Sequence, residues 1–262
     1  MSFEHLAIEI DGAVARLRMT RPELMNRVDE PCHRELIEAF RILAHDRAIR
    51  AVVWSAGGRV FSAGGDLNEI YSQTADIDRR IEMALQAREL IYGLLDIPAP
   101  VIVALHGHAY GLAATLLMLC DAVVAVPEAR IADTHVKVGL VAGDGGIVGW
   151  PSAISLMRAK YHLLTGEPLT AKDAYGLGMV TKLAETPEAC WKTAESLARQ
   201  IAALPPIAVQ GTKKTFNALL RARADEVLEL GLAYEQGSLT TADLVEAVEA
   251  FREKREPVYH GH

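Results

Sequence analysis

The hydrophobic positions near the N-terminus follow a period of two. Leu6, Ile8 and Ile10 alternate with other residues, and the pair Asp11–Gly12 separates them from a second alternating stretch. Such alternation around an Asp-Gly pair is typical of a β-hairpin. The sequence therefore predicts two paired strands within the first 20 residues.

The period changes to that of a helix over residues 30–44, where the apolar positions are Leu36, Ile37, Phe40 and Leu43. Asp29 is a candidate N-cap for this helix, and Pro31 fits its first turn. Similar patterns predict a helix over 76–96 and an apolar helix that ends at Cys120. A last helix is predicted from about Thr240, which has capping-box spacing to Asp243.

Between these helices, short apolar strands alternate with glycine-containing turns. Strands are predicted at 51–54, 101–105 and 122–126, and the turns lie at 61–67, 106–111 and 139–149. This recurrence predicts a stacked α/β arrangement with its loops gathered at one end. The pattern is nearly all helical after Pro151, so we divide the chain into a core, 1–200, and a helical C-terminal region, 201–262.

Composition and charge narrow the classes of function. The 262 residues are 50% hydrophobic and 23% charged, as in globular proteins, and the net charge of −7 argues against nucleic acid or an anionic membrane as partner. The longest apolar run ends at Asp121, too early for a membrane span. Three distant cysteines fit neither a disulfide framework nor a zinc site. We expect a soluble, cytoplasmic protein with no metal.

Each glycine-containing turn offers a possible chemical function. The first two can present backbone N–H groups to an oxyanion, since glycines let a ligand approach the backbone and a helix N-terminus leaves such groups free. The third carries Asp144 among glycines, nine residues after His135. Histidine suits proton transfer near neutral pH. The alternatives are structural: Asp144 can cap its own backbone in an Asx-turn, and His135 can be a satisfied, partly exposed histidine at a strand end.

The combination and order of several motifs resemble the crotonase, or enoyl-CoA hydratase/isomerase, superfamily over essentially the whole chain. The matching stretches are Arg21-Pro-Glu-Leu-Met-Asn26, Ala51-Val-Val-Trp54, Phe61-Ser-Ala-Gly-Gly-Asp-Leu67, Pro100-Val-Ile-Val-Ala104, Gly107-His-Ala-Tyr-Gly111, Cys120-Asp121, Gly143-Asp-Gly-Gly146, Leu163-Leu-Thr-Gly166, Ala174-Tyr-Gly-Leu-Gly-Met-Val180 and Phe251-Arg-Glu-Lys-Arg255. The resemblance implies an α/β crotonase-like ββα superhelix (the ClpP/crotonase fold), with a helical trimerisation region at the C-terminus. It also implies a homotrimer or a dimer of trimers.

The resemblance further implies an acyl-CoA substrate, with coenzyme A as part of the substrate, no separate cofactor and a place in fatty acid metabolism. The thioester oxygen would lie between the amides of Gly65 and Leu112. The CoA-binding positions that it implies are Met25, Ala63, Asp66, Leu67, Phe251 and Lys254, the last two from a neighbouring subunit. Lys254 would then lie near a phosphate.

The chain departs from the resemblance where hydratases carry two glutamates that activate water. Thr115 and His135 stand at those positions, so the two-glutamate mechanism does not carry over. The leading hypothesis is an acyl-CoA lyase or isomerase in which His135 is the acid/base, Asp144 orients it or acts on substrate, and Thr115 can bond water. The alternatives are a β-diketone C–C bond hydrolase that does not need CoA and a non-catalytic acyl-CoA binder.

Four further residues are weaker candidates for the pocket. His33 lies on the first helix, His108 in the second turn, and Trp150 just after the third turn. Glu235 lies on a C-terminal helix and can enter an acyl pocket from there.

Overall fold

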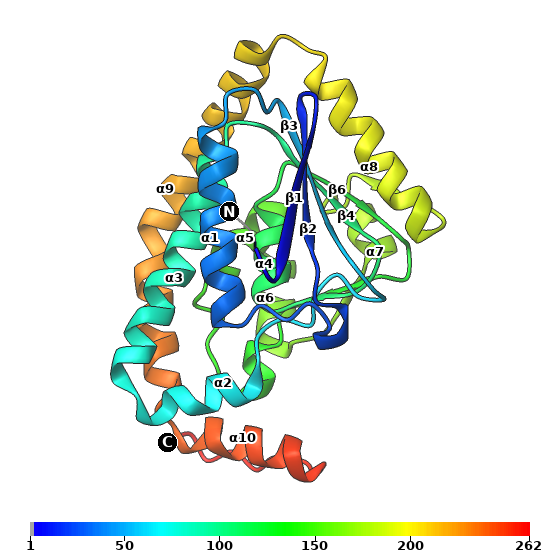
Figure 1. Cartoon of the computed structure of the whole chain (residues 1–262). Helices are drawn as coiled ribbons and strands as arrows, with labels where there is room; N and C mark the ends of the chain where they lie inside the picture. Colours follow the sequence, from blue (N-terminus) through cyan, green and yellow to red (C-terminus); the bar gives the residue numbers. More distant parts are fainter. Residues whose placement is uncertain (1–2) are drawn as a thin grey trace.

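A six-stranded sheet forms the centre of the molecule in the computed structural model, which describes residues 3–262 (Figure 1). Its strand order is β1-β2-β3-β4-β6-β9, with β1 antiparallel to β2 and the other neighbours parallel. The strands are β1 (Leu6–Asp11), β2 (Val14–Met19), β3 (Ala51–Ala56), β4 (Val101–Leu105), β6 (Ala122–Ala125) and β9 (Lys182–Leu183). The predicted hairpin is confirmed as β1 and β2, with Leu6 opposite Met19.

The parallel strands β3 and β4 are the most deeply buried part of the sheet. Every residue from Val101 to Leu105 is buried, as is every residue from Ala51 to Ser55. Helices cover both faces of a parallel sheet, so its strands are continuous apolar runs and do not alternate. This explains why the short apolar runs in the sequence predicted these strands correctly.

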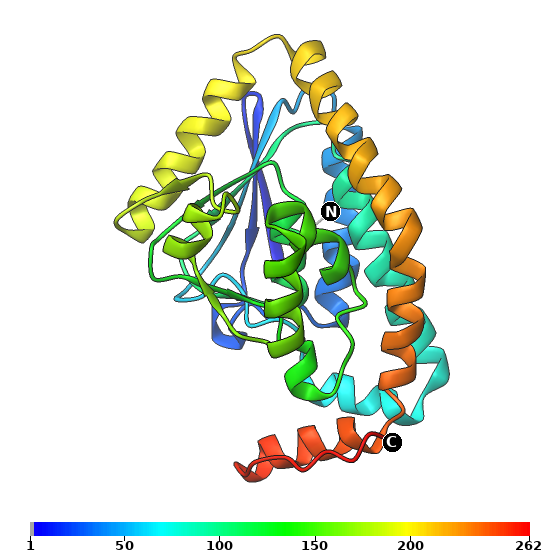
Figure 2. The same cartoon turned by 180° about the vertical axis from the view of Figure 1, so that it is seen from behind.

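Helices cover both sides of the sheet (Figures 1 and 2). Helix α8 packs on β3, β4 and β6, whereas α1, α3 and α9 lie on the opposite side. The helices are α1 (Glu30–His45), α2 (Leu67–Ser72), α3 (Ile77–Asp96), α4 (Leu112–Met118), α5 (Gly146–Ala153), α6 (Leu156–Thr165), α7 (Ala171–Gly176), α8 (Pro187–Ala202), α9 (Pro206–Ser238) and α10 (Ala242–Glu253), with 3-10 turns η1 (Pro22–Leu24), η2 (Gln73–Ala75) and η3 (His135–Val138).

A second, three-stranded sheet supports the turns that follow the main strands. It consists of β5 (Ala109–Tyr110), β7 (Arg130–Ala132) and β8 (Leu169–Thr170). Ser62 forms an isolated bridge to Ala109, which attaches the first glycine-containing turn to this sheet. The first two predicted turns therefore lie side by side, although about 45 residues separate them in the chain.

The C-terminal helices pack back onto the core. Ala224, Leu228 and Leu232 of α9 belong to the same buried apolar cluster as the strands, and α9 packs along α3 and α5. Helix α10 packs against α2 and η3 at one end of the molecule (Figure 1). The proposed boundary near residue 200 stays a prediction.

No helix within residues 3–262 is long and apolar enough to cross a membrane.

Helix caps were predicted with mixed success. Asp29 caps α1 as expected, accepting a hydrogen bond from the backbone N of Cys32. The prediction for α10 was wrong by one residue, because Thr241 and not Thr240 accepts from the backbone N of Leu244. The carboxylate of Asp243 instead accepts from the backbone N–H groups of His260 and Gly261, which folds the C-terminal residues back along this helix.

A direct contact between the backbones of Gly143 and Gly231 positions α9 against the third glycine-containing turn. A Cβ added at Gly143 would overlap the carbonyl of Gly231 and lie 2.8 Å from the Cβ of Glu235. Only a residue without a side chain lets the helix backbone come this close to the turn that carries Asp144.

Gly143→Ala should therefore lower the free energy of unfolding by about 1–3 kcal/mol, since the turn and α9 must separate to make room. Chemical denaturation measures this change. The control is Gly211→Ala, on α9, whose new Cβ would meet nothing within 4 Å, and which should leave stability equal or slightly higher. Equal stability of the Gly143→Ala variant and the wild type would show that the contact is not this tight.

Candidate active site

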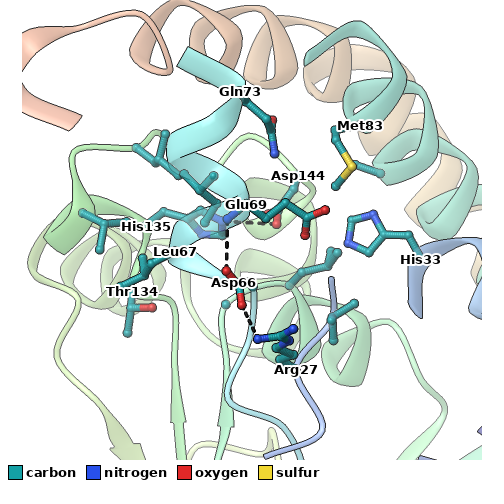
Figure 3. A pocket seen from close by; sticks show the side chains of 18 of the residues that line it. Arg27, His33, Asp66, Leu67, Glu69, Gln73, Met83, Thr134, His135 and Asp144 are labelled. Atoms are coloured by element: carbon teal, nitrogen blue, oxygen red, sulfur yellow. Dashed lines mark hydrogen bonds and ion pairs between the residues drawn. The ribbon is translucent and has the colours of Figure 1, made fainter. Parts of the chain in front are cut away.

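A cavity of about 610 Å³ lies where the turns, α1, α3, α9 and α10 meet (Figure 3). The structure brings most of the predicted site residues to its lining: Met25, His33, Ala63, Gly65, Asp66, Leu67, Leu112, His135, Asp144, Glu235 and Phe251. These residues come from both ends of the chain, so only the folded protein brings them together.

Gly65 and Leu112 line the same cavity because the two turns that carry them touch backbone to backbone. The amides of Phe61 and Ser62 donate to the carbonyl of His108 at 2.9 and 3.0 Å. Gly64 has φ +84°, and a Cβ there would lie 2.9 Å from the carbonyl oxygen of Tyr110. A side chain at Gly64 would therefore force the turns apart.

The amides of Gly65 and Leu112 have no acceptor among the described residues, 3–262. Their neighbours are engaged: the amide of Gly64 donates to the Ser62 hydroxyl at 3.1 Å, and that of Gly111 to the Ala132 carbonyl at 2.9 Å. Leu112 begins α4, whose first N–H groups have no partner within the helix. Two free donors at one cavity are the arrangement that stabilises an oxyanion.

His135 lies between two aspartates, one of which the sequence reasoning missed. Its Nδ1 is 2.7 Å from Oδ1 of Asp133, and its Nε2 is 3.3 Å from Oδ2 of Asp144. Asp133 Oδ1 also accepts from the backbone N of His135 at 3.1 Å, so this carboxylate fixes both the ring and the start of η3. Asp133 is 1% exposed and follows β7 directly.

The two carboxylates favour the charged form of His135. Burial alone would lower the pKa of His135, but the charges of Asp144 and Asp133, together with their hydrogen bonds, raise this pKa well above its ordinary value. Burial raises the pKa of Asp133, whereas the charge of His135 outweighs it, and the net shift is downward. We therefore describe His135 at neutral pH as an imidazolium between the carboxylates of Asp133 and Asp144.

Asp144 keeps one oxygen available for a ligand. Within residues 3–262, no group of the protein hydrogen-bonds its buried Oδ1, whereas Oδ2 faces His135. Figure 3 shows Asp144 and His135 beside each other, with His33 and Met83 on another side of the cavity. At the cavity lining, Asp144 thus combines a buried carboxylate oxygen that has no protein partner with the neighbouring positive charge of His135.

Glu235 and His33 both enter the cavity in uncharged form. Burial, and then the nearby charge of Asp144, raise the pKa of Glu235 to about 8. Burial lowers the pKa of His33 to about 4, against the smaller opposite effect of Asp144. Two of the four weaker candidates from the sequence are therefore in the cavity, and each is neutral at pH 7.

Asp66 has structural partners as well as a place in the cavity lining. Its carboxylate caps α2 by accepting from the backbone N–H groups of Asn68 and Glu69 at 2.8 and 3.0 Å. Its other oxygen is paired with Arg27, which also contacts Asp29. Asp66 therefore orders the segment that enters α2, whatever it contacts in a ligand.

Four predicted residues are not among those that line the cavity. The packing of the core accounts for Thr115 and Trp150, which are fully buried, and Trp150 stacks on His162. The Nδ1 atom of His108 accepts from the backbone N of Arg130, and its ring stacks on Tyr110. Lys254 is an exposed residue that ends α10 with φ 55°.

Phe251 lines the cavity of its own chain and is 68% exposed, because α10 packs against α2 of the same chain. Its expected contact with the site of a neighbouring subunit stays a prediction.

Asp133, His135 and Asp144 also form the group among the described residues whose ligand atoms lie close enough to share a cation. One imidazole serves both carboxylates here, through a different nitrogen each. A cation bound by these three residues would have to replace a proton of the His135 imidazole.

We expect the imidazole of His135 to titrate with a midpoint above about 6.5, its unperturbed value. NMR of labelled histidine measures this midpoint, and Asp144→Asn should lower it by removing one favourable charge. Because the folded-state pKa is raised, the stabilising contribution is complete below about pH 6.5 and is lost as the pH rises through the folded value. Glu226→Gln, an exposed charge removal on α9, should not move it, and a wild-type midpoint at or below 6.5 would contradict this electrostatic description.

Comparison with known proteins agrees with this architecture. The family model for enoyl-CoA hydratase/isomerase matches residues 9–262. The (E)-benzylidenesuccinyl-CoA hydratase of Thauera aromatica is 33% identical over 261 residues, which cover 98% of this chain and 99% of the relative. An enoyl-CoA hydratase/isomerase from Mycobacterium paratuberculosis has a similar solved structure, with TM-score 0.89, 36% identity and coverage of 94% and 97% of the two chains.

A third similar protein is a β-diketone hydrolase from the cyanobacterium Anabaena, solved with bound (S)-3-oxocyclohexyl acetic acid. Its TM-score is 0.85 at 28% identity, with 91% of this chain and 95% of that chain covered. With the family model spanning nearly the whole chain, the protein belongs to the enoyl-CoA hydratase/isomerase family and has the crotonase fold.

Proposed function

We propose that this protein catalyses proton transfer on an acyl-CoA thioester, with the amides of Gly65 and Leu112 as the oxyanion hole. The observation that carries the proposal is that both free amides and the His135–Asp144 pair line one cavity. The relative from Thauera aromatica, named as a hydratase of a CoA thioester, supports the substrate class.

The oxyanion hole lowers the barrier to forming an enolate. Removal of a proton from the α-carbon places negative charge on the thioester oxygen, and two fixed N–H donors stabilise that charge without reorganising. Loss of one such donor typically costs about 3–4 kcal/mol of transition-state stabilisation. Enolate formation is therefore the step for which this site is prepared.

Asp144 is the proposed proton acceptor and His135 its partner. The free Oδ1 of Asp144 takes the α-proton, while the imidazolium of His135, oriented by Asp133, stabilises the carboxylate through Oδ2. Returning the proton to a different carbon gives isomerisation. In hydration Asp144 instead takes a proton from water as the water oxygen bonds to the β-carbon of an enoyl thioester, and the resulting enolate takes that proton at its α-carbon. This scheme replaces the two-glutamate mechanism, since Thr115 and His135 stand where the resemblance expects glutamates, and Thr115 is assigned no proton-transfer step.

The CoA moiety would lie along the opening of the cavity. We assign its contacts to Met25, Ala63, Asp66, Leu67, Phe251 and Lys254. Five of these line the cavity, whereas Lys254 follows the end of α10 at the surface. A flexible, exposed lysine suits a phosphate that is partly in solvent. In this scheme CoA belongs to the substrate, and no other cofactor takes part.

One comparison favours a second candidate, the β-diketone C–C bond hydrolase that does not need CoA. The similar structure from Anabaena is named as such an enzyme, and a carboxylate such as Asp144, supported by His135, can also activate water. Calorimetry with free CoA and acetyl-CoA separates the candidates, because a diketone hydrolase should bind neither at millimolar concentration.

A screen of acyl-CoA thioesters for hydration, isomerisation and hydrolysis should identify a reaction that the wild type catalyses. His135→Ala and Asp144→Asn should each lower kcat about 10²- to 10⁴-fold, as loss of an acid or base typically does, with CoA affinity nearly unchanged. Matched controls are His45→Ala and Glu226→Gln, both exposed. Wild-type turnover in both site variants would refute the assignment. If the wild type binds a thioester but shows neither turnover nor solvent deuterium uptake by that thioester, the result would favour a non-catalytic binder.

We also propose that the chain forms a homotrimer or a dimer of trimers. Large apolar side chains exposed along α9, among them Ile207, Phe216 and Leu219, support an interface on this helix. Light scattering after size exclusion should give three or six times the mass of one chain. Phe216→Glu should shift the mass towards that of a monomer, and a wild-type monomer would contradict the proposal.

A further inference from the structure

We propose that the acyl group bound in the cavity carries an uncharged oxygen, a hydroxyl or keto group, beyond the thioester carbonyl, and that Glu235 and His33 bind it. This inference rests on the proposed function, since it names the substrate class of the same site. It concerns two side chains to which the proton-transfer scheme assigns no role. Both line the cavity that contains His135 and Asp144.

Glu235 reaches the cavity because α9 lies unusually close to the third turn. Gly143 and Gly231 face each other where the two backbones meet: a Cβ at Gly143 would overlap the carbonyl of Gly231, and a Cβ at Gly231 would lie 3.1 Å from the carbonyl oxygen of Gly143. The helix therefore brings Glu235 next to the turn that carries Asp144. Among the described residues, the buried Oε2 of Glu235 has no hydrogen-bond partner.

His33 approaches the cavity from α1, where its backbone N donates to the carbonyl of Asp29 at 2.9 Å. The residue is 5% exposed, and its buried Nδ1 has no partner within residues 3–262. In Figure 3, His33 and Met83 lie on the right, His135 lies on the left, and Asp144 lies between them. Two polar side chains from helices far apart in the sequence thus line one cavity, and each has one buried atom without a protein partner.

Buried polar groups without partners favour a ligand that supplies the missing hydrogen bonds. A plain hydrocarbon chain would displace water and leave both groups unpaired, which costs free energy for each. An oxygen on the acyl group restores the bonds: protonated Glu235 donates to it, and neutral His33 donates or accepts. Sites built for such bonds reject analogues that lack the polar group far more strongly than apolar pockets reject an added group.

The surrounding charges favour an uncharged oxygen over a carboxylate. The imidazolium of His135 is already shared by Asp133 and Asp144. Arg27, which also lines the cavity, is paired with Asp29 and Asp66. A carboxylate on the ligand would meet the negative charge of Asp144 with no unpaired cation among these residues to offset it. A hydroxyl or keto group carries no charge and meets no such repulsion.

The test compares affinities for hexanoyl-CoA and its 3-oxo, 4-oxo and 5-oxo forms, all as dethia analogues that cannot be hydrolysed. Calorimetry with the wild type should show the best oxo ligand binding about 10²-fold or more tightly than hexanoyl. Glu235→Leu and His33→Phe should each reduce this preference to a few-fold, mainly by tighter binding of hexanoyl. Glu235→Gln, which still hydrogen-bonds, should retain most of it.

Glu226→Gln, on the exposed side of the same helix, serves as the matched control and should keep the full preference. Equal affinity of the wild type for hexanoyl and every oxo ligand would overturn the inference while leaving the proposed function in place. A preference that survives both apolar substitutions would also overturn it. If neither CoA nor any of the four analogues binds the wild type, the proposed function fails, and this inference fails with it.

Discussion

The backbone contact between two glycine-containing turns is the constraint on which the site depends. Because Gly64 has no side chain, the first turn can lie against Tyr110 of the second. The strand bridge from Ser62 to Ala109 fixes their register. The free amides of Gly65 and Leu112 then face the same cavity. The buried parallel strands β3 and β4 lead into these two turns, so the oxyanion donors rest on the most deeply buried part of the sheet.

Three ionisable side chains, Asp133, His135 and Asp144, meet at one wall of the cavity. Asp133 is among the most buried carboxylates of the chain, and its cost is offset by the bonds it accepts from the backbone and ring of His135. The imidazolium in turn supports Asp144, which keeps an oxygen for a ligand. Glu235 and His33 are neutral nearby. Proton transfer and recognition of the acyl group are thereby assigned to different side chains of one cavity.

Much of this fold could be predicted from the sequence because its signals are local. The apolar runs of β3 and β4, the Asp-Gly hairpin and the Asp29 cap each depend on neighbouring residues. The error at Thr240 shows the limit of a cap signal when two threonines are adjacent. The family resemblance also brought the Gly65 and Leu112 amides together before any geometry was known.

The parts of the site that escaped prediction depend on distant packing. Asp133 looked like an ordinary residue after a strand, and only its closeness to both the ring and the backbone of His135 gives it a role; its position two residues before a candidate histidine was the available signal. Glu235 enters the cavity through a contact between Gly143 and Gly231, 88 residues apart in the sequence. The burial of Thr115 likewise depends on helix packing, which the pattern of one helix does not determine.

The central claim is that Gly65 and Leu112 polarise a thioester carbonyl. Isotope-edited infrared spectroscopy of a bound acyl-CoA with a ¹³C-labelled carbonyl measures this directly. Two fixed donors in a cavity screened from water should lower the carbonyl stretching frequency below its value in water. A bound frequency equal to or higher than that in water would contradict the account.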